Sequence, residues 1–155
     1  MERKTKITAE EGRQDLFITR EFDLPVELLF KAYTEADIVD QWMNTKVLQL
    51  ESRPNGAYHY QTSDPGGNVV FEGHGVIHEL TDNEKITRTF EMKNAGFDVQ
   101  LEFLRFEAIG EERSRLGTHM IFRSAELRDK QLKLPFSYGI NMAHDRLEEI
   151  VKQIK

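Results

Sequence analysis

The sequence contains no cysteine, and this absence excludes several kinds of chemistry at once. Without thiols the chain forms no disulfide, has no thiolate nucleophile and supplies no cysteine ligand for a zinc site. Histidine is present, but His74 and His78 share one face of a predicted strand about 13 Å apart, at about 3.3 Å of rise per residue. That spacing is too long for one metal ion. We therefore expect neither a metal nor a cofactor.

Long hydrophobic runs and an excess of positive charge are also missing. No segment approaches the length of a membrane span, and Met1–Lys6 is not the apolar core of a secretion signal. The chain has 27 acidic against 21 basic residues and a formal net charge of −6. Nucleic acids bind through basic surfaces, so this balance disfavours them as partners. We expect a cytoplasmic protein without a membrane span.

The chain does contain enough apolar material for one substantial core. Hydrophobic residues make up 39% of its 155 residues, and they include ten phenylalanines and four tyrosines. This length is typical of one domain. No linker, repeat or low-complexity segment divides it. We therefore interpret residues 1–155 as a single domain with its core at about 14–152.

Hydrophobic periodicity predicts a first strand, two short helices, six further strands and a long helix. The first strand covers residues 16–22, and the short helices cover 26–33 and 36–42. Residues before these are expected to be frayed or extended. The six later strands, separated by turns rich in Gly, Asn and Asp, are predicted at 47–50, 57–61, 69–80, 86–92, 98–108 and 113–123.

Two features of this pattern bear on the shape of the sheet. Gly73 and Gly75 lie inside the longest predicted strand, where they indicate a bend or a bulge. After Pro135 the apolar residues fall on one stripe of a long helix, with charged residues opposite. A seven-stranded antiparallel sheet that curves around this helix buries one face of each and leaves a cavity where the helix does not fill it. The fold class is therefore α+β.

Several segments, in this order, resemble the family named after the activator of the heat-shock-protein-90 ATPase, within the START-related (SRPBCC) superfamily. They are residues 25–34 (PVELLFKAYT), 38–42 (IVDQW), the turns 53–56 (RPNG) and 64–67 (DPGG), and the strand segment 73–80 (GHGVIHEL). The resemblance covers residues 14–152. It implies the helix-grip fold, with a cavity between the sheet and the last helix.

Large apolar and aromatic side chains are the candidates for lining this cavity. Such residues supply apolar contact area, and tyrosine hydroxyls can orient a ligand. The alternative is that the same side chains fill the core and leave no cavity. The predicted lining residues are Trp42, Tyr58, Tyr60, Phe90, Phe103, Met120, Phe122, Tyr138 and Met142.

No catalytic motif is present. The chain has no nucleophile-elbow serine motif, no His-Glu-x-x-His and no phosphate loop, so we predict no catalytic residue. Glu72, Glu91 and Glu102 lie within strands, where a buried acid would be able to do acid–base work. We place all three on the outer face, because residues 102–107 mix both signs as cross-strand ion pairs do. We also place His144 on the flank of the last helix.

Three functions remain open. The first, which we favour, is binding of a small apolar ligand in the cavity, without a conventional catalytic site. The second is a chaperone-associated interaction module, implied by the family resemblance, with homodimerisation as a milder variant. The third is an enzyme resembling a polyketide cyclase, which requires a buried acid or base beside the cavity.

Overall fold

One antiparallel sheet forms the body of the structure, a computed structural model that describes residues 4–93, 95–133 and 135–154. The strands in these ranges are β1 (Lys6–Thr8), β2 (Asp15–Phe22), β3 (Lys46–Leu50), β4 (Ala57–Ser63), β5 (Val69–Thr81), β6 (Lys85–Met92), β7 (Gln100–Gly110) and β8 (Arg113–Ile121). Their order across the sheet is β1-β2-β8-β7-β6-β5-β4-β3. The helices are α1 (Val26–Thr34), α2 (Ala36–Trp42), α3 (Ala125–Lys133) and α4 (Phe136–Lys152).

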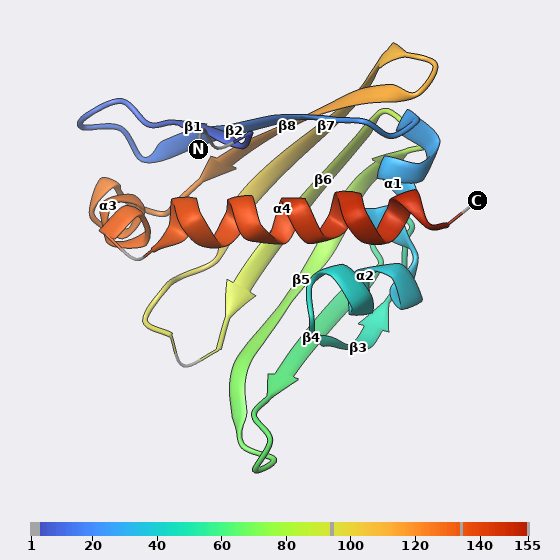
Figure 1. Ribbon diagram of the computed structural model, residues 1–155. Coiled ribbons are helices and arrows are strands. Elements are labelled where there is room, and N and C mark those ends of the chain that lie inside the picture. Colours follow the sequence, from blue (N-terminus) through green and yellow to red (C-terminus); the bar gives the residue numbers. More distant parts are fainter. Residues whose placement is uncertain (1–3, 94, 134, 155) are drawn as a thin grey trace.

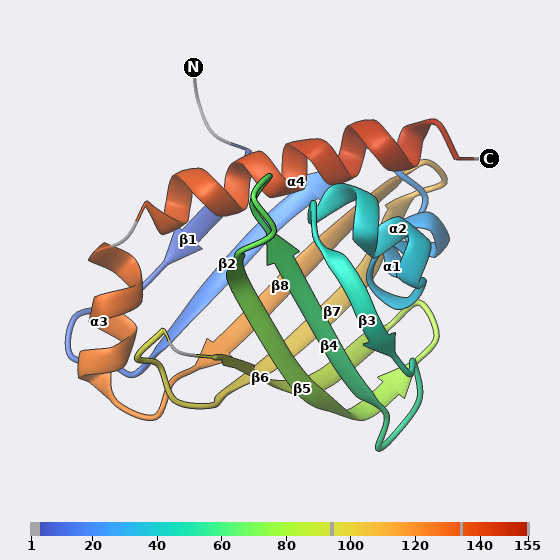
Figure 2. The ribbon, with the colours of Figure 1, turned by 90° about the horizontal axis from the view of Figure 1, so that it is seen from below.

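The sheet curves around α4, which crosses its concave face (Figures 1 and 2). Near the C-terminal end of α4, α1 and α2 cover one end of the sheet, and α3 lies beside the start of α4 (Figures 1 and 2). This confirms the predicted α+β fold and the curved antiparallel sheet. None of the helices among the described residues is long and apolar enough to cross a membrane.

The sheet has one strand more than predicted. β1 pairs with β2, from Lys6 opposite Thr19 to Thr8 opposite Phe17, in a segment that we expected to be frayed or extended. A strand of three residues carries too little alternation to be seen in a sequence. It forms because the edge of β2 offers unpaired backbone groups that another segment can satisfy.

Helix α3 was also not predicted, because it has no apolar stripe. Its one fully buried residue is Arg128, whose side chain is 4% exposed. The guanidinium donates hydrogen bonds to the carbonyl oxygens of Glu10 at 2.6 Å and Asp15 at 3.1 Å. The helix is therefore tied to the start of β2 by a cation, in addition to the half-buried Leu127 and Leu132 that pack against the cluster of Leu16, Ile18 and Phe122.

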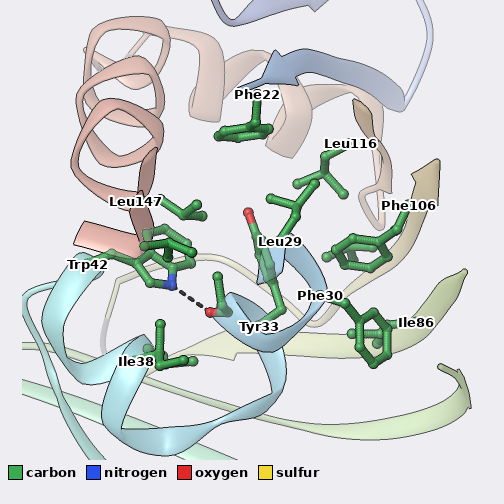
Figure 3. Packing of buried hydrophobic residues seen from close by; sticks show 14 of the residues in the cluster. Phe22, Leu29, Phe30, Tyr33, Ile38, Trp42, Ile86, Phe106, Leu116 and Leu147 are labelled. Atoms are coloured by element: carbon green, nitrogen blue, oxygen red, sulfur yellow. Dashed lines mark hydrogen bonds between the residues drawn. The ribbon is translucent and has the colours of Figure 1, made fainter. Parts of the chain in front are cut away.

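The apolar interior forms two clusters at the two ends of α4. The larger one packs α1, α2 and the last turns of α4 on the sheet, with Leu29 and Leu147 fully buried (Figure 3). There the indole Nε1 of Trp42 donates a hydrogen bond of 2.6 Å to the carbonyl oxygen of Ala32. The smaller cluster lies under α3 and the first turns of α4, and it consists of Leu16, Ile18 and Phe122 with half-buried neighbours that include Met120 and Ile140.

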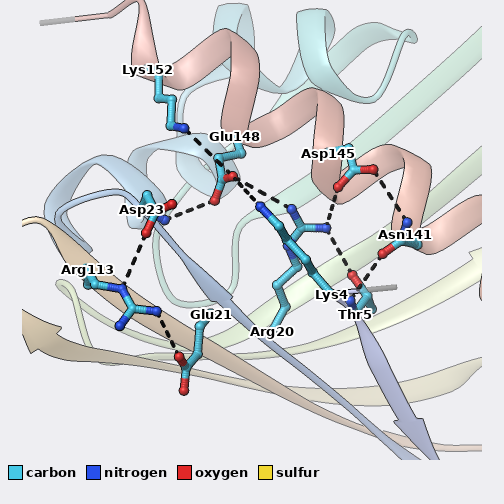
Figure 4. Close-up of polar contacts among 10 residues, drawn as sticks. All are labelled: Lys4, Thr5, Arg20, Glu21, Asp23, Arg113, Asn141, Asp145, Glu148 and Lys152. Carbon is cyan, nitrogen blue, oxygen red and sulfur yellow. Dashed lines mark hydrogen bonds and ion pairs between the residues drawn. The ribbon is translucent and has the colours of Figure 1, made fainter. Parts of the chain in front are cut away.

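A buried polar network attaches the middle of α4 to β2 (Figure 4). The Arg20 side chain is 1% exposed, and its Nη1 lies 2.8 Å from Oδ1 of Asp145 and 3.3 Å from Oγ1 of Thr5. Glu148 accepts a hydrogen bond of 2.9 Å from the backbone N–H of Asp23. His144 lies 2.9 Å from the same Thr5 hydroxyl.

His144 is buried and not on the helix flank, so that expectation was wrong. Its ring packs edge-on against Phe22 with a centroid distance of 5.5 Å. Burial, and then the nearby charge of Arg20, lowers the pKa of His144 to about 3. In the unfolded chain a histidine titrates near about 6.5. The unfolded state therefore binds the extra proton first as the pH falls.

This difference predicts an acid-sensitive fold. The contribution of neutral His144 is complete above about pH 6.5 and is lost as the pH falls toward 3, with a slope that approaches about 1.4 kcal/mol per pH unit. We expect urea unfolding between pH 7 and 5 to show this loss, and His144→Gln to remove most of the slope. His78→Gln, at an exposed histidine, is the control that keeps it. Equal slopes in all three proteins would refute the assignment.

Candidate functional site

A buried ion pair lies on the concave face where the two apolar clusters meet. Arg88 of β6 and Glu102 of β7 are cross-strand partners, with Nε and Oε1 2.9 Å apart and side chains 15% and 5% exposed. Oε2 of Glu102 accepts a hydrogen bond of 2.7 Å from Gln100. In the sheet register, Glu102 lies opposite Met120 of the smaller cluster and Arg88 opposite Ile77 of the larger one.

Three tyrosines surround the guanidinium of Arg88. Its central carbon lies 5.2 Å from the ring centroid of Tyr58 and 6.0 Å from that of Tyr33, distances typical of cation–π contacts. Tyr60 packs against Tyr58 with a centroid distance of 5.3 Å. The Tyr58 hydroxyl donates a hydrogen bond of 2.5 Å to the carbonyl oxygen of Thr89.

The electrostatics keep Arg88 charged and the tyrosines neutral. Burial raises the pKa of Tyr33, Tyr58 and Tyr60 above the usual range, so their hydroxyls stay protonated, and that of Tyr58 is already used as a donor to Thr89. Burial acts to lower the pKa of Arg88, but the pKa is raised overall, with the charge and the hydrogen bond of the Glu102 carboxylate among the causes. The site therefore presents a cation, a carboxylate and neutral hydroxyl groups in an apolar environment.

Two glycines of β5 make room for the aromatic side chains of this face. A Cβ atom at Gly73 would lie 2.5 Å from the ring of Phe90, and one at Gly75 would collide first with the carbonyl oxygen of Thr89 and then lie 2.8 Å from the Tyr58 hydroxyl. Phe90 consequently stacks between Tyr58 and Phe71, with centroid distances of 6.4 Å to each. The strand does contain a register shift against β6, but it lies between Ile77 and Glu79 and not at the two glycines where we expected it.

The predicted lining residues divide into three groups. Trp42, Tyr58 and Tyr60 are buried in the larger cluster, and Phe90 packs half-buried against it. Met120 and Phe122 belong to the smaller cluster, while Tyr138 and Met142 are 55% and 40% exposed on the first half of α4. The structure therefore brings Tyr58, Tyr60 and Phe90 together around Arg88, and it does not bring the complete set into one site.

Two placements on β7 were wrong. Phe103 is 39% exposed on the convex face, and Glu102, which we placed outside, points inward. Large apolar side chains occur on both faces of this strand: Leu101 and Phe103 lie on one face, and Leu104 and Phe106 on the other. Alternation alone therefore could not show which face is buried. Glu72 and Glu91 do lie at the surface, beside His59 and His74.

Comparison with known proteins identifies the family. The model of the family described as activator of Hsp90 ATPase homologue 1-like protein matches residues 23–152. The chain belongs to this family. No curated protein sequence matches it significantly.

Solved structures agree with the fold. A crystal structure of a Mycobacterium smegmatis protein is similar, with a TM-score of 0.83 and 17% identity over 97% of this chain and 98% of the other. A Nitrosomonas europaea protein is 22% identical, with a TM-score of 0.78 over 96% of this chain and 100% of the other. A protein from Arthrobacter aurescens is 14% identical, with a TM-score of 0.84 over 96% of this chain and 91% of the other. At these identities the likeness establishes the fold alone.

The buried pair predicts a non-additive effect on stability. Arg88→Met and Glu102→Leu should each lower the free energy of unfolding by about 3–5 kcal/mol, because each leaves a buried charge unpaired. The double variant should lie within about 1 kcal/mol of wild type, since an apolar pair of similar volume needs no partner. Denaturant titration measures all three.

The exposed pair Arg123–Asp98 provides a matched control. Its atoms are 3.6 Å apart and its side chains are 74% and 54% exposed. Arg123→Met should change the free energy of unfolding by less than about 1 kcal/mol. Additive losses in the Arg88→Met/Glu102→Leu protein would show that the pair itself is required for stability.

Proposed function

We propose that this protein binds a small molecule with an apolar body and an uncharged polar group on the concave face of the sheet. The observation that carries this proposal is the buried Arg88–Glu102 pair, enclosed by Tyr33, Tyr58 and Tyr60. The helix-grip fold of the family supports it, because it gives one helix a broad concave face to cover. The proposal refines our expectation of a purely apolar ligand.

A role in stability does not explain the pair well. Taking two charges out of water costs several kcal/mol for each ion, and a buried ion pair recovers this only with good geometry and additional hydrogen bonds. An apolar pair would fill the same space without that cost. Charged groups with convergent hydroxyls at a concave surface are instead typical of sites that orient a ligand.

The chemistry of the pair indicates which polar group it accepts. Arg88 and Glu102 cancel in charge, so a charged ligand gains little net attraction. Together with the tyrosine hydroxyls they offer both donors and acceptors, which suits a hydroxyl or carbonyl group. The half-buried side chains of Phe71 and Phe90 supply apolar contacts for the rest of the molecule.

Ligand entry requires side-chain movement. Five surface pockets found among the described residues are not lined by Arg88, Glu102 or the three tyrosines. The side chains that can move aside are the partly exposed ones at the edge of this face, Phe71, Phe90 and Met92. Binding should therefore be slower than association with an open pocket.

A second candidate is an enzyme that acts on such a ligand. The observation that favours it is Glu102, a buried acid on the concave face, which the polyketide-cyclase hypothesis required. The chaperone-associated hypothesis rests on the family alone, and stimulation of a heat-shock ATPase would test it.

Native mass spectrometry of gently purified protein, with organic extraction, tests the binding proposal. We expect wild type to carry a neutral amphiphilic compound, or to gain at least 3 °C in melting temperature with such compounds at millimolar concentration. The Arg88→Met/Glu102→Leu protein should lose both effects while it stays folded, and Arg123→Met/Asp98→Leu should keep them. Wild type that purifies empty and is stabilised by no neutral amphiphile would refute the proposal.

A further inference from the structure

The convex face of the sheet carries a row of aromatic side chains that is exposed to solvent. Phe17 of β2, His119 of β8 and Phe103 of β7 are cross-strand neighbours in the sheet register. The Phe17 and His119 rings stack at 4.1 Å with an interplanar angle of 7°, and the Phe103 ring centroid lies 6.0 Å from His119. Phe17 is 45% exposed and Phe103 is 39% exposed.

Gly117, the residue of β8 that precedes His119 on the same face of the sheet, leaves a hollow beside this row of aromatic side chains. Gly117 lies opposite Thr19 on one side and Arg105 on the other. A Cβ atom there would meet nothing within 4 Å, so the glycine leaves open space where a neighbouring residue would project a side chain. The hollow measures about 390 Å³ and is lined by Phe17, Phe103, His119 and Gly117, among others. This volume suits a small ligand.

The row of Phe17, His119 and Phe103, which forms the aromatic wall of the hollow, is held in place by polar contacts of His119. Nε2 of His119 lies 2.8 Å from Oδ2 of Asp15, and Oδ1 of Asp15 accepts a hydrogen bond of 2.8 Å from Nε of Arg13. The hydrogen bonds from Arg13 and then His119 hold the pKa of the Asp15 carboxyl well below its usual range. An ionised Asp15 on one side and the stacked Phe17 ring on the other fix the imidazole plane. Preorganisation of this kind lowers the entropic cost of binding.

The charge at the rim favours an anion. Arg105 is exposed, and it has no ion-pair or hydrogen-bond partner among the residues that the structure describes. The other cation of the hollow, Lys85, is already 3.4 Å from the carboxylate of Glu79. A free guanidinium binds carboxylates with two parallel hydrogen bonds. The aromatic wall and Arg105 are two residues apart on one face of one strand, about 7 Å at about 3.4 Å per residue.

We propose that this hollow is a second binding site, on the face opposite Arg88 and Glu102, for a planar aromatic carboxylate. The ring of the ligand lies over Gly117 against His119 and Phe103, and its carboxylate pairs with Arg105. This ligand differs in charge from the one proposed for the concave face, so the two sites can be examined independently.

The probe for the test is 2-naphthoate, followed by ¹H–¹⁵N NMR of the full chain. We expect shifts centred on Gly117, Thr118 and His119, with a Kd below about 1 mM, which corresponds to about −4 kcal/mol. Arg105→Gln should weaken binding at least fivefold. Arg115→Gln is the matched control, because Arg115 lies on the same face but already pairs with Glu21 at 3.0 Å. The neutral 2-naphthamide should bind at least fivefold more weakly.

Two further variants separate the hollow from the fold. Gly117→Leu should abolish binding with little change in melting temperature, because the new side chain enters open space. Phe103→Thr, at an exposed position, should weaken binding if the leucine variant does not fold. The Arg88→Met/Glu102→Leu protein should bind 2-naphthoate as wild type does. Absence of shifts near Gly117 at 5 mM probe (about −3 kcal/mol at most), equal affinity in Arg105→Gln, or shifts confined to the concave face would each overturn the proposal.

Discussion

The attachment of α4 to the concave face is the interaction on which the rest of the structure depends. A broad antiparallel sheet buries one face only if other elements cover it, and here α4 crosses that face while α1 and α2 cover one end of it (Figures 1 and 2). Leu147 and Val151, both fully buried, provide the apolar part of this contact. Arg20 provides the polar part, because it reaches from β2 to Asp145 and lies near Glu148. The helix position is thus set by packing at both ends and by charge in its middle.

This arrangement explains why the interior is divided. An apolar cluster forms at each end of α4, and the polar groups of the concave face lie where the two clusters meet. Arg20 and Arg88 differ in their partners. Arg20 bonds to carboxylates on the helix and therefore attaches α4 to β2, whereas Arg88 pairs with Glu102 on the neighbouring strand, where the backbone ladder of β6 and β7 already makes the connection. An ion pair between two strands that are already hydrogen-bonded to each other adds little to the architecture, which is why we propose a binding role for it.

The helices and strands with strong periodicity could be predicted from the sequence, and this covers most of the fold. α2 was predicted with its exact ends at Ala36 and Trp42, and the amphipathic stripe of α4 was visible because its pattern extends over many residues. What escaped prediction depends on tertiary contacts. The strand β1 forms only against the edge of β2, and α3 is held by Arg128, whose long polar side chain gives no sign of burial in a sequence.

The candidate site was less predictable, for a related reason. Tyr58 and Tyr60 were predicted because aromatic residues alternate with polar ones along β4, but Tyr33 of α1 was not. Arg88 was also missed, although it alternates in step with Ile86 and Phe90, which face the core. This alternation with two core residues was the feature of the sequence from which the inward position of Arg88 could have been predicted. On β7 no such signal existed, since apolar residues occupy both phases. Only the pairing of β7 with β6 and β8 decides that Glu102 faces inward and Phe103 outward.

Because Glu102 faces inward and Phe103 outward, the two faces of the sheet differ in their chemistry. On the concave side, charges are paired and enclosed, so that the recognition we propose there depends on hydrogen bonds to a neutral group. On the convex side, Phe103 lies exposed beside Gly117 and the unpartnered Arg105 of the described chain. Side chains alternate between the two faces along a strand, and β7 therefore has a shielded polar site on one face of the sheet and an open aromatic hollow on the other. A ligand that binds one face has no chemical reason to bind the other.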